Sequence, residues 1–424
     1  MGEFIGYRCS VCGKAYGPSE ATYTCPADSG NLDVILDWEG IARHLRPADI
    51  ATSREESVWR YLPLLPVGEP GHDGTPLHAA GWTPLFAPPR LRQAAGLPQL
   101  WLKDDGRNPT ASFKDRASAI VVARAQQIGA HTVVTASTGN AGAALAGMAA
   151  AAGQPAVILA PRTAPPAKVA QLLMFGARVF LVEGTYDQAF DLTLEAAQAF
   201  GWYCRNTGYN PFTSQGKKTA AFEIAEQFTN AVGKDPAGSG PWSVPDAVFV
   251  SVGDGNIIAG LHAGFDDLLR LGWIERMPKL FGIQSEGSAA IYNAFVSGQE
   301  TIVPVQATTM ADSISVDLPR DGLRALRAAT RTGGAYLAVP DSDILAAMTV
   351  LARAAAVFAE PAGATAYAGI APALRGGLIT PEDRIVVLNT GNGLKDVKAA
   401  MQAAEAATII EPTLPALRKV VGNG

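Results

Sequence analysis

Short, almost wholly apolar runs alternate with longer amphipathic segments along most of this chain. Such runs are typical of strands buried on both faces of a parallel sheet, and apolar residues spaced three or four apart indicate helices. The pattern predicts strands at 132–136, 156–160, 178–182, 247–251, 280–284 and 385–389. It predicts helices at 115–128, 140–152, 168–175, 187–200, 217–228 and 257–271, with a Pro-rich, irregular stretch at 40–110. The chain is therefore expected to be an α/β protein with two open parallel sheets and a ligand cleft between them.

The composition is that of a folded protein with a large buried core. Of 424 residues, 48% are hydrophobic and 17% are charged, which excludes a disordered chain. The net charge of −5 gives no long-range attraction for nucleic acids. The most apolar stretch, 141–161, is interrupted by glycines and a proline, so we expect no membrane span. The first residues lack the features of a signal peptide and the four cysteines are too few for a disulfide scaffold, so we expect a cytoplasmic protein.

Lys114 is the first candidate for chemistry, because it follows an Asn-Pro turn and stands at the start of a predicted helix. The positive end of the helix dipole favours the neutral form of an amine placed there. A neutral amine is what imine formation with an aldehyde cofactor requires. The alternative is a solvated lysine beside Asp115.

Three loops follow predicted strands, at the edge where parallel sheets bind ligands: 137–142, 252–256 and 388–396. Hydroxyls and backbone N–H groups at a helix start bind anions, and glycines let the backbone approach a phosphate. Helix capping and tight turns are the alternatives. Loop 252–256 lacks the G-x-G-x-x-G spacing of dinucleotide sites, and its Asp254 is expected to point away from an anion or to cap the helix.

Five segments, in their order along the chain, resemble those of the threonine synthase family. They are Ser112-Phe113-Lys114-Asp115-Arg116, Ser137-Thr138-Gly139-Asn140-Ala141, the glycine loop 253–256, Glu360-Pro361-Ala362-Gly363-Ala364 and Thr390-Gly391-Asn392-Gly393-Leu394-Lys395-Asp396. This family belongs to the fold-type II enzymes that use pyridoxal 5′-phosphate (PLP), so the resemblance implies a tryptophan synthase β-like fold. It divides the chain into an N-terminal segment at 1–40, a large PLP-binding domain at 41–114 and 216–424, and a small α/β domain at 115–215.

The resemblance also implies a role for each site residue. Lys114 would form the Schiff base with PLP and move protons at the substrate's Cα and Cβ atoms. Further cofactor contacts would come from Asn140 to the phenolic oxygen, Thr390 to the pyridine nitrogen, and Gly253, Asp254, Gly255, Asn256 and Ile257 around the phosphate. The substrate α-carboxylate would be held by Ser137, Thr138, Asn140 and Ala141, and the substrate phosphate by Asn206, Thr207 and Lys217.

One position departs from the family pattern in the segment that would bind the substrate phosphate. The family usually has an arginine two residues after the Asn-Pro pair, where this chain has Thr213. A threonine hydroxyl brings no charge, so Lys217 is a candidate for the missing cation. Either the phosphate is held differently or the substrate is not O-phosphohomoserine.

The N-terminal segment resembles a zinc knuckle in which one position has changed. Cys9, Cys12 and Cys25 match three of the four cysteines found in many relatives, and Asp28 stands at the fourth position. Structural zinc sites are nearly always built from sulfur and imidazole, so a degenerate knuckle without metal is favoured over bound zinc.

The activity implied by the resemblance is conversion of O-phospho-L-homoserine and water into L-threonine and phosphate. The alternative is PLP-dependent β-elimination or β-replacement on serine-, phosphoserine- or threonine-like substrates, of the threonine dehydratase, cysteate synthase or diaminopropionate ammonia-lyase type. A scaffold that has lost activity is a third hypothesis, and the intact Lys114 argues against it. A homodimer with an amino-acid substrate is expected. Glu360 either reaches the cleft or caps a helix before Pro361, and Asp312 and Ser313 are expected to border the cleft.

Overall fold

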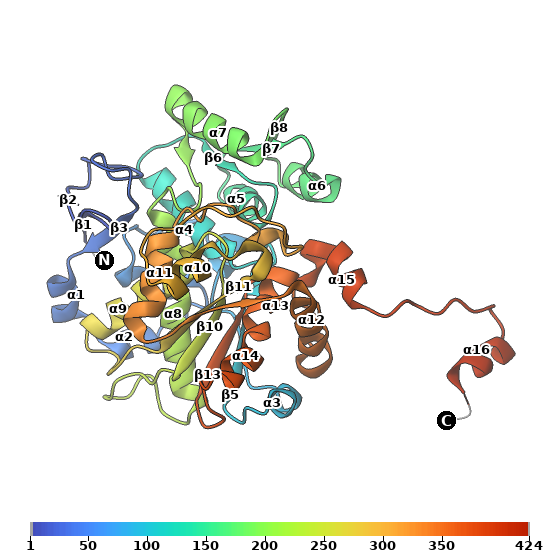
Figure 1. Ribbon diagram of the computed structural model, residues 1–424. Coiled ribbons are helices and arrows are strands. Elements are labelled where there is room, and N and C mark those ends of the chain that lie inside the picture. Colours follow the sequence, from blue (N-terminus) through green and yellow to red (C-terminus); the bar gives the residue numbers. More distant parts are fainter. Residues whose placement is uncertain (1–2, 423–424) are drawn as a thin grey trace.

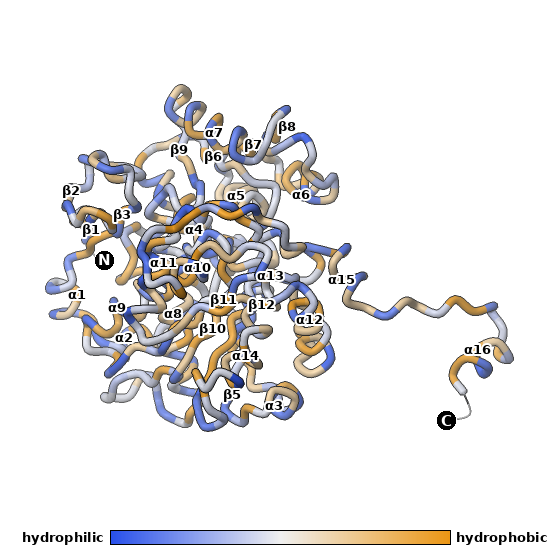
Figure 2. Tube along the Cα trace, in the orientation of Figure 1, coloured by the Kyte–Doolittle hydropathy of each residue, from blue (hydrophilic) through white to orange (hydrophobic). Residues whose placement is uncertain are grey.

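The computed structural model describes residues 3–422, which form three β-sheets and the helices that cover them (Figure 1). The largest sheet has the strand order β12-β11-β10-β13-β5-β4, and all neighbouring pairs are parallel except the edge pair β4–β5. Its strands are β4 (Leu85–Phe86), β5 (Leu100–Asp104), β10 (Ala247–Ser251), β11 (Lys279–Ser285), β12 (Tyr336–Val339) and β13 (Ile385–Asn389). Figure 2 shows β10 in the hydrophobic colour, as expected for a strand covered on both faces.

A smaller parallel sheet of order β8-β7-β6-β9 lies at the top of Figure 1. Its strands are β6 (Val133–Ala136), β7 (Ala156–Pro161), β8 (Arg178–Val182) and β9 (Tyr203–Cys204), and the helices beside it are α5 (Asn140–Ala151), α6 (Pro166–Met174) and α7 (Tyr186–Phe200). The two parallel sheets confirm the predicted α/β architecture.

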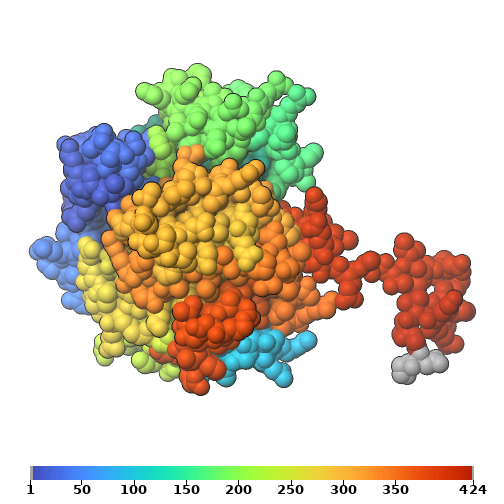
Figure 3. All heavy atoms as spheres, viewed as in Figure 1, coloured from blue at the N-terminus to red at the C-terminus, as the bar shows by residue number. Residues whose placement is uncertain are grey.

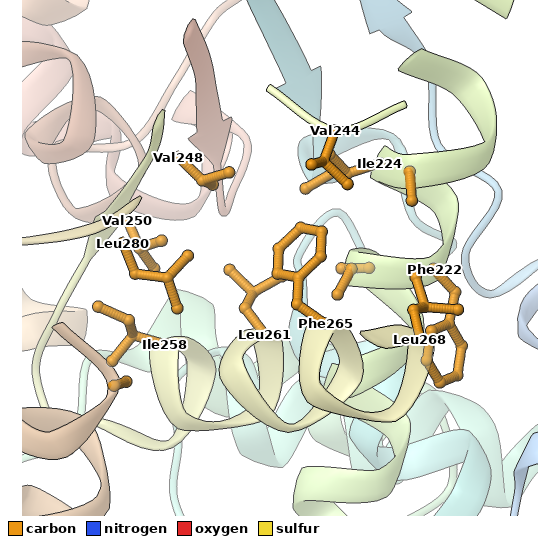
Figure 4. Close-up of a cluster of buried hydrophobic side chains, with 14 of the residues drawn as sticks. Phe222, Ile224, Val244, Val248, Val250, Ile258, Leu261, Phe265, Leu268 and Leu280 are labelled. Carbon is orange, nitrogen blue, oxygen red and sulfur yellow. The ribbon is translucent and has the colours of Figure 1, made fainter. Parts of the chain in front are cut away.

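Helices α4 (Lys114–Gln127) and α8 (Phe212–Ala231) connect the two sheets, and α9 (Asn256–Arg270) connects β10 to β11 within the large sheet. Helix α8 packs against both α4 and α9, and α4 also packs against α5. Figure 4 shows the apolar face of α9, with Leu261 and Phe265, turned toward the sheet residues Val248, Val250 and Leu280. Each such side chain stabilises the fold by about 1.5–3 kcal/mol when fully buried. This packing fixes the first turn of α9 relative to β10.

The remaining helices cover the large sheet and the N-terminal region: α1 (Trp38–His44), α2 (Pro47–Ala51), α3 (Pro89–Ala95), α10 (Ala290–Ser297), α11 (Gly322–Thr332), α12 (Asp341–Ala355), α13 (Pro361–Ala368), α14 (Ile370–Arg375) and α15 (Val397–Ala403). The N-terminal strands β1 (Phe4–Cys9), β2 (Ala15–Tyr16) and β3 (Leu32–Leu36) form a small antiparallel sheet. The last helix, α16 (Leu414–Val421), stands away from the body of the molecule (Figure 3). No described helix has the length and apolar character of a membrane span.

The sequence-based prediction was wrong in two places. The stretch 40–110, predicted to be irregular, contains three helices and β5, which lies inside the large sheet between β13 and β4. Helix α8 begins at Phe212 instead of 217, because the side chain of Asn210 accepts a hydrogen bond from the Phe212 N–H at 2.8 Å and so supports an earlier start. The division into domains stays a prediction, and its limit at residue 215 lies within α8.

Candidate active site

A cavity of about 510 Å³ opens between the two parallel sheets. It brings together all eight of the predicted cofactor residues: Lys114, Asn140, Gly253, Asp254, Gly255, Asn256, Ile257 and Thr390. An adjoining cavity of about 350 Å³ shares Asn140, Ser313 and Glu360 with it and is also lined by Thr138 and Asp312. Together they form one cleft, placed where the sequence predicted it.

Lys114 is positioned by backbone hydrogen bonds between its own loop and the end of β13. The N–H of Phe113 donates to the carbonyl of Thr390 at 2.9 Å, and the N–H of Asn392 donates to the carbonyl of Ala111 at 3.0 Å. Thr390 therefore faces the same cavity as the lysine that begins α4. The side chain of Asp115 accepts from the Thr110 N–H at 2.6 Å and from the Thr110 hydroxyl, so Thr110 is its hydrogen-bond partner.

The Lys114 amine lies in an environment that favours its neutral form. Burial and, next, the positive charge of Arg205 lower the pKa of Lys114 to about 8. Asp254 and Glu360 act in the opposite direction without cancelling these effects. At pH 7 about a tenth of the amine is then neutral. Lys114 is half-buried in the wall of the cavity, which argues against the freely solvated lysine considered as an alternative.

The loop before α9 can hold an anion because its glycines leave its backbone N–H groups uncovered by side chains. These glycines also pack closely against other segments of the protein. Gly255 has φ +88°, and a Cβ atom there would lie 2.5 Å from the Cβ of Ala325. A Cβ on Gly253 would lie 2.8 Å from the Cα of Ile314. The first N–H groups of α9 follow directly and point along the helix axis toward the cavity end of the helix.

Asp254 does not cap α9, because Gly255 occupies the N-cap position. Its carboxylate accepts instead from the Arg320 N–H at 3.2 Å, and its carbonyl accepts from the Asp321 N–H at 2.9 Å. Burial raises the pKa of Asp254. The residue therefore ties the glycine loop to the segment before α11, and its carboxylate is partly turned to that segment.

Lys217 and Asn256 form a buried pair beside the glycine loop. The Lys217 amine donates to the Asn256 Oδ1 atom. The Asn256 amide in turn donates to the Ser214 hydroxyl at 2.9 Å and to Asp321 at 2.6 Å. Burial, followed by the charges of Lys114 and Arg205, holds the pKa of Lys217 well below its usual value. The lysine thus stands on the side of the cleft where α9 begins.

On the opposite wall, Asn140 at the start of α5 meets Glu360 at the start of α13. The Asn140 amide donates to Glu360 at 2.7 Å and to the Ser313 hydroxyl at 3.4 Å. Glu360 makes no side-chain cap of α13, so it reaches the cleft rather than capping its helix. Burial raises the pKa of Glu360 to about 7.

Four predicted substrate residues do not line either cavity within the part of the chain that the structure describes: Ser137, Ala141, Asn206 and Lys217. Thr207 does line the larger cavity. Asn206 lies directly behind the wall, where its Oδ1 atom accepts from the Thr135 hydroxyl at 2.9 Å and from the Ala136 N–H at 2.8 Å.

Two polar residues among those that sequence reasoning missed matter most for the site. Ser251, at the end of β10, lines the larger cavity. Arg205 follows β9 and is fully buried behind Thr207, to whose hydroxyl it donates at 2.6 Å. The signal for Arg205 was present, because an arginine directly after an apolar strand needs a buried partner.

The cleft fits PLP, an aldehyde that carries a phosphate. It offers a buried amine of lowered pKa for the aldehyde and a glycine loop at a helix N-terminus for the phosphate. Thr390 offers a hydroxyl for the ring nitrogen.

The N-terminal cysteines gather into a cluster that fits a zinc ion. The ligand atoms of Cys9, Cys12, Cys25 and Asp28 all lie within 4.8 Å of one another. The sulfurs of Cys12 and Cys25 are 3.8 Å apart, close to the spacing of about 3.8 Å that two Zn–S bonds of 2.3 Å give in a tetrahedron. The sequence favoured a degenerate knuckle without metal, and that stays a prediction, whereas the geometry supports bound zinc more than the residue types alone did.

Known proteins with similar sequences identify the family of this chain. The model of the family described as "Pyridoxal-phosphate dependent enzyme" matches residues 77–391. Threonine synthases of Methanocaldococcus jannaschii and Methanosarcina acetivorans are each 36% identical to this chain, over 98% of both sequences. The threonine synthase of Mycobacterium leprae is 35% identical over 81% of this chain and 89% of its own.

Solved structures share the fold at low sequence identity. A threonine deaminase isoform of Solanum lycopersicum has a TM-score of 0.65 at 23% identity, covering 81% of this chain and 97% of its own. Diaminopropionate ammonia lyase of Escherichia coli has a TM-score of 0.63 at 20% identity, covering 84% and 91%. Since these identities show only the fold, the sequence relatives carry the assignment: this chain is a PLP-dependent enzyme of fold type II and belongs to the threonine synthase family.

Proposed function

We propose that this protein converts O-phospho-L-homoserine and water into L-threonine and inorganic phosphate. The observation that carries this proposal is the cleft itself, in which the amine of Lys114, the glycine loop and the segment around Thr207 meet. The proposal is supported by relatives that bear the name threonine synthase and align with almost the whole chain. When bound, PLP supplies an electron sink for charge that develops on the substrate carbons.

Lys114 is proposed to move protons at the Cα and Cβ atoms of the substrate. Its pKa of about 8 lets it accept a proton near neutral pH and return it later. Elimination breaks the Cγ–O bond, whose electron pair leaves with the phosphate. A proton is then added at Cγ, the oxygen of water bonds to Cβ as the water gives up a proton, and a proton returns to Cα.

Other residues are proposed to bind and orient the substrate and cofactor. The substrate α-carboxylate would meet the start of α5, where Ser137, Thr138, Asn140 and Ala141 lie. Glu360 would hold Asn140 in place through its 2.7 Å hydrogen bond, so that the Asn140 amide faces the cofactor oxygen. Gly253, Gly255, Asn256 and Ile257 would hold the cofactor phosphate, and Thr390 would bond the ring nitrogen. A neutral threonine hydroxyl cannot hold a full proton on that nitrogen, which leaves more of the proton transfer to Lys114.

The direct test incubates purified holoenzyme with O-phospho-L-homoserine and measures phosphate and L-threonine. We expect both products in equal amounts, and neither from K114A. Borohydride reduction followed by peptide mass mapping should attach the cofactor to Lys114. Absence of both products would remove the proposed activity, and a tag on another residue would remove the role of Lys114.

Thr213 gives weight to a second candidate, β-elimination or β-replacement on a serine-, phosphoserine- or threonine-like substrate. Its hydroxyl donates to the Asn210 carbonyl at 2.7 Å, so this position places no cation in the cleft. A keto-acid assay with serine, phosphoserine and threonine separates the candidates. Rapid keto-acid formation, with no turnover of O-phospho-L-homoserine, would favour this second activity.

We propose in addition that the protein acts as a cytoplasmic homodimer. This rests on the resemblance to the family. Sedimentation velocity of the holoenzyme should give twice the mass of the 44.2 kDa chain. A monomer across the micromolar range would contradict the proposal.

A further inference from the structure

Arg205 is a buried cation whose hydrogen-bonding capacity is not used up by the protein. The side chain has no exposed surface. Its Nη1 atom donates to the Thr207 hydroxyl at 2.6 Å and its Nε atom donates to the Ser118 hydroxyl at 3.3 Å. Its Nη2 atom has no partner among the described residues. A guanidinium that meets only neutral hydroxyls is costly to bury, because no counter-charge replaces the lost water.

The next residue in the chain repeats this feature. Asn206 is 1% exposed, and both hydrogen bonds at its Oδ1 atom come from the β6 residues Thr135 and Ala136. These bonds fix the orientation of the amide, so its Nδ2 atom is the end that remains free, and it has no partner in the described structure. Two consecutive residues thus hold unused buried donors, which is the arrangement an acceptor-rich anion would satisfy.

Thr207 links these donors to the cleft. It lines the same cavity as Lys114 and Thr390, and its hydroxyl oxygen accepts the Arg205 hydrogen bond. The guanidinium therefore reaches the wall of the cavity through this hydroxyl. The positive charge of Arg205 also contributes to the lowered pKa of Lys114 and of Lys217.

Lys217, the cation that the sequence analysis proposed for the substrate phosphate, forms a hydrogen bond on the cofactor side of the cleft. The Lys217 amine bonds Asn256, the first residue of α9, beside the loop that fits the cofactor phosphate. Position 213, where the family usually has arginine, holds a threonine that bonds the backbone of Asn210. The cofactor phosphate and the substrate phosphate would each need a source of positive charge. Lys217 lies beside the loop for the cofactor phosphate, so the substrate phosphate needs another cation.

We propose that Arg205 binds the phosphate of the substrate, together with the Asn206 amide and the Thr207 hydroxyl, and that it replaces the arginine absent from position 213. The inference rests on the proposed function, which it deepens by assigning the leaving group to a phosphomonoester dianion. A guanidinium fork suits such a dianion better than an ammonium does. Lys217 then serves the cofactor phosphate.

The test compares R205Q, R205K and wild-type holoenzyme. In holoenzyme the cofactor phosphate fills its own loop, so added inorganic phosphate reports on the substrate pocket alone. We expect R205Q to raise the KM for O-phospho-L-homoserine and the inhibition constant of inorganic phosphate by about 30- to 150-fold each. The kcat should change far less than the KM. R205K, which keeps the charge but not the fork, should fall between R205Q and wild type.

Two control variants separate this role from a structural one. R92Q removes an arginine of α3 whose Nε atom bonds the Leu100 carbonyl at 2.9 Å, and it should leave both constants unchanged. K217M should weaken retention of the cofactor, measured by absorbance after gel filtration, whereas R205Q should not. Unchanged phosphate inhibition in both Arg205 variants would overturn the proposal. If R205Q does not fold, R205K alone decides the question: an inhibition constant for phosphate equal to that of the wild type would overturn the proposal.

The outcomes distinguish this inference from the proposed function. If wild-type holoenzyme releases no phosphate from O-phospho-L-homoserine, the activity is wrong, and isothermal titration with inorganic phosphate still tests Arg205 by itself. If the wild type turns over and its phosphate affinity is unaffected by R205Q, the activity stands and the role of Arg205 is wrong.

Discussion

Replacing Glu223 with glutamine should destabilise the protein more than any comparable change at its surface. Glu223 on α8 accepts hydrogen bonds from Arg116 at 2.7 Å and from Lys103 at 2.7 Å. Arg116 also donates to Asp105 at 2.6 Å. All four side chains are completely buried. Because Arg116 follows Lys114 by two residues, this network also fixes the start of α4.

The size of the effect follows from the charge that E223Q leaves behind. In the variant, two buried cations face the single carboxylate of Asp105, and breaking a buried pair in this way costs about 3–5 kcal/mol. The pKa of Glu223 gives a similar value. Burial raises it, but Arg116 and Lys103 outweigh burial and lower it to about 2, against an ordinary value of about 4.5. That depression contributes about 3 kcal/mol at neutral pH.

The sign of the pH dependence follows from the lowered pKa. The stabilisation from Glu223 is fully present above about pH 4.5 and is lost as the pH falls toward about 2. Urea denaturation followed by circular dichroism should give E223Q a lower unfolding midpoint at pH 7, with a difference that shrinks below about pH 4.

The matched control is E183Q, which removes the same charge from an exposed pair. Glu183 and Arg162 are 78% and 71% exposed, so this change should cost less than about 1 kcal/mol. If E223Q and E183Q shift the midpoint equally, burial of the network does not stabilise the fold and the reasoning is wrong.

Three further predictions concern the cleft and the cysteine cluster. E360Q should remove the inflection near pH 7 from the activity profile, because burial raises the pKa of Glu360 to about 7; E286Q, at an exposed carboxylate, should keep it. G255A should weaken cofactor binding at least tenfold in a fluorescence titration, because the added Cβ atom would lie 2.5 Å from Ala325. The control G129A changes a glycine with φ +71° that has open space around it, so it should only lower the free energy of unfolding by about 1 kcal/mol. Mass spectrometry should find one zinc per chain, lost in D28A and kept in D28C, and a metal-free wild type would mean a degenerate knuckle.

The sequence was most informative where a pattern is local. Strands β10 and β13 were predicted with the bounds they have, because continuous apolar runs reflect burial on both faces. The bounds of β8 were also predicted correctly, although it is an edge strand with mostly exposed side chains. The loops after β6, β10 and β13 were placed correctly for a related reason, since the carboxyl ends of parallel strands meet at one edge.

Local sequence patterns could not predict residues whose burial is stabilised by partners far away in the sequence. Strand β5 contains Lys103 and Asp104, which look like loop residues. Lys103 is buried against Glu223 at 2.7 Å, and Asp104 accepts from Asn389 at 2.7 Å, with both partners more than a hundred residues away. Neither contact is visible in the local sequence. The hydrogen bond from Arg205 to Ser118, 87 residues away, is equally hidden, although an arginine directly after an apolar strand is a local signal of a buried, paired side chain.

The buried charges of the cleft explain why it needs anions. Lys114, Lys217 and Arg205 each have a lowered pKa, and the charges of Lys114 and Arg205 contribute to the lowered pKa of Lys217. Asp254 and Glu360 compensate little, because burial raises their pKa values and disfavours their charged forms. Burial is the first cause of each lowered pKa, and a bound phosphate would favour the charged forms of these groups and relieve the repulsion between them. We expect Lys217 at the start of α9 to hold the cofactor phosphate and Arg205 at the end of β9 to bind the leaving group, so that phosphate can depart while the cofactor stays in place.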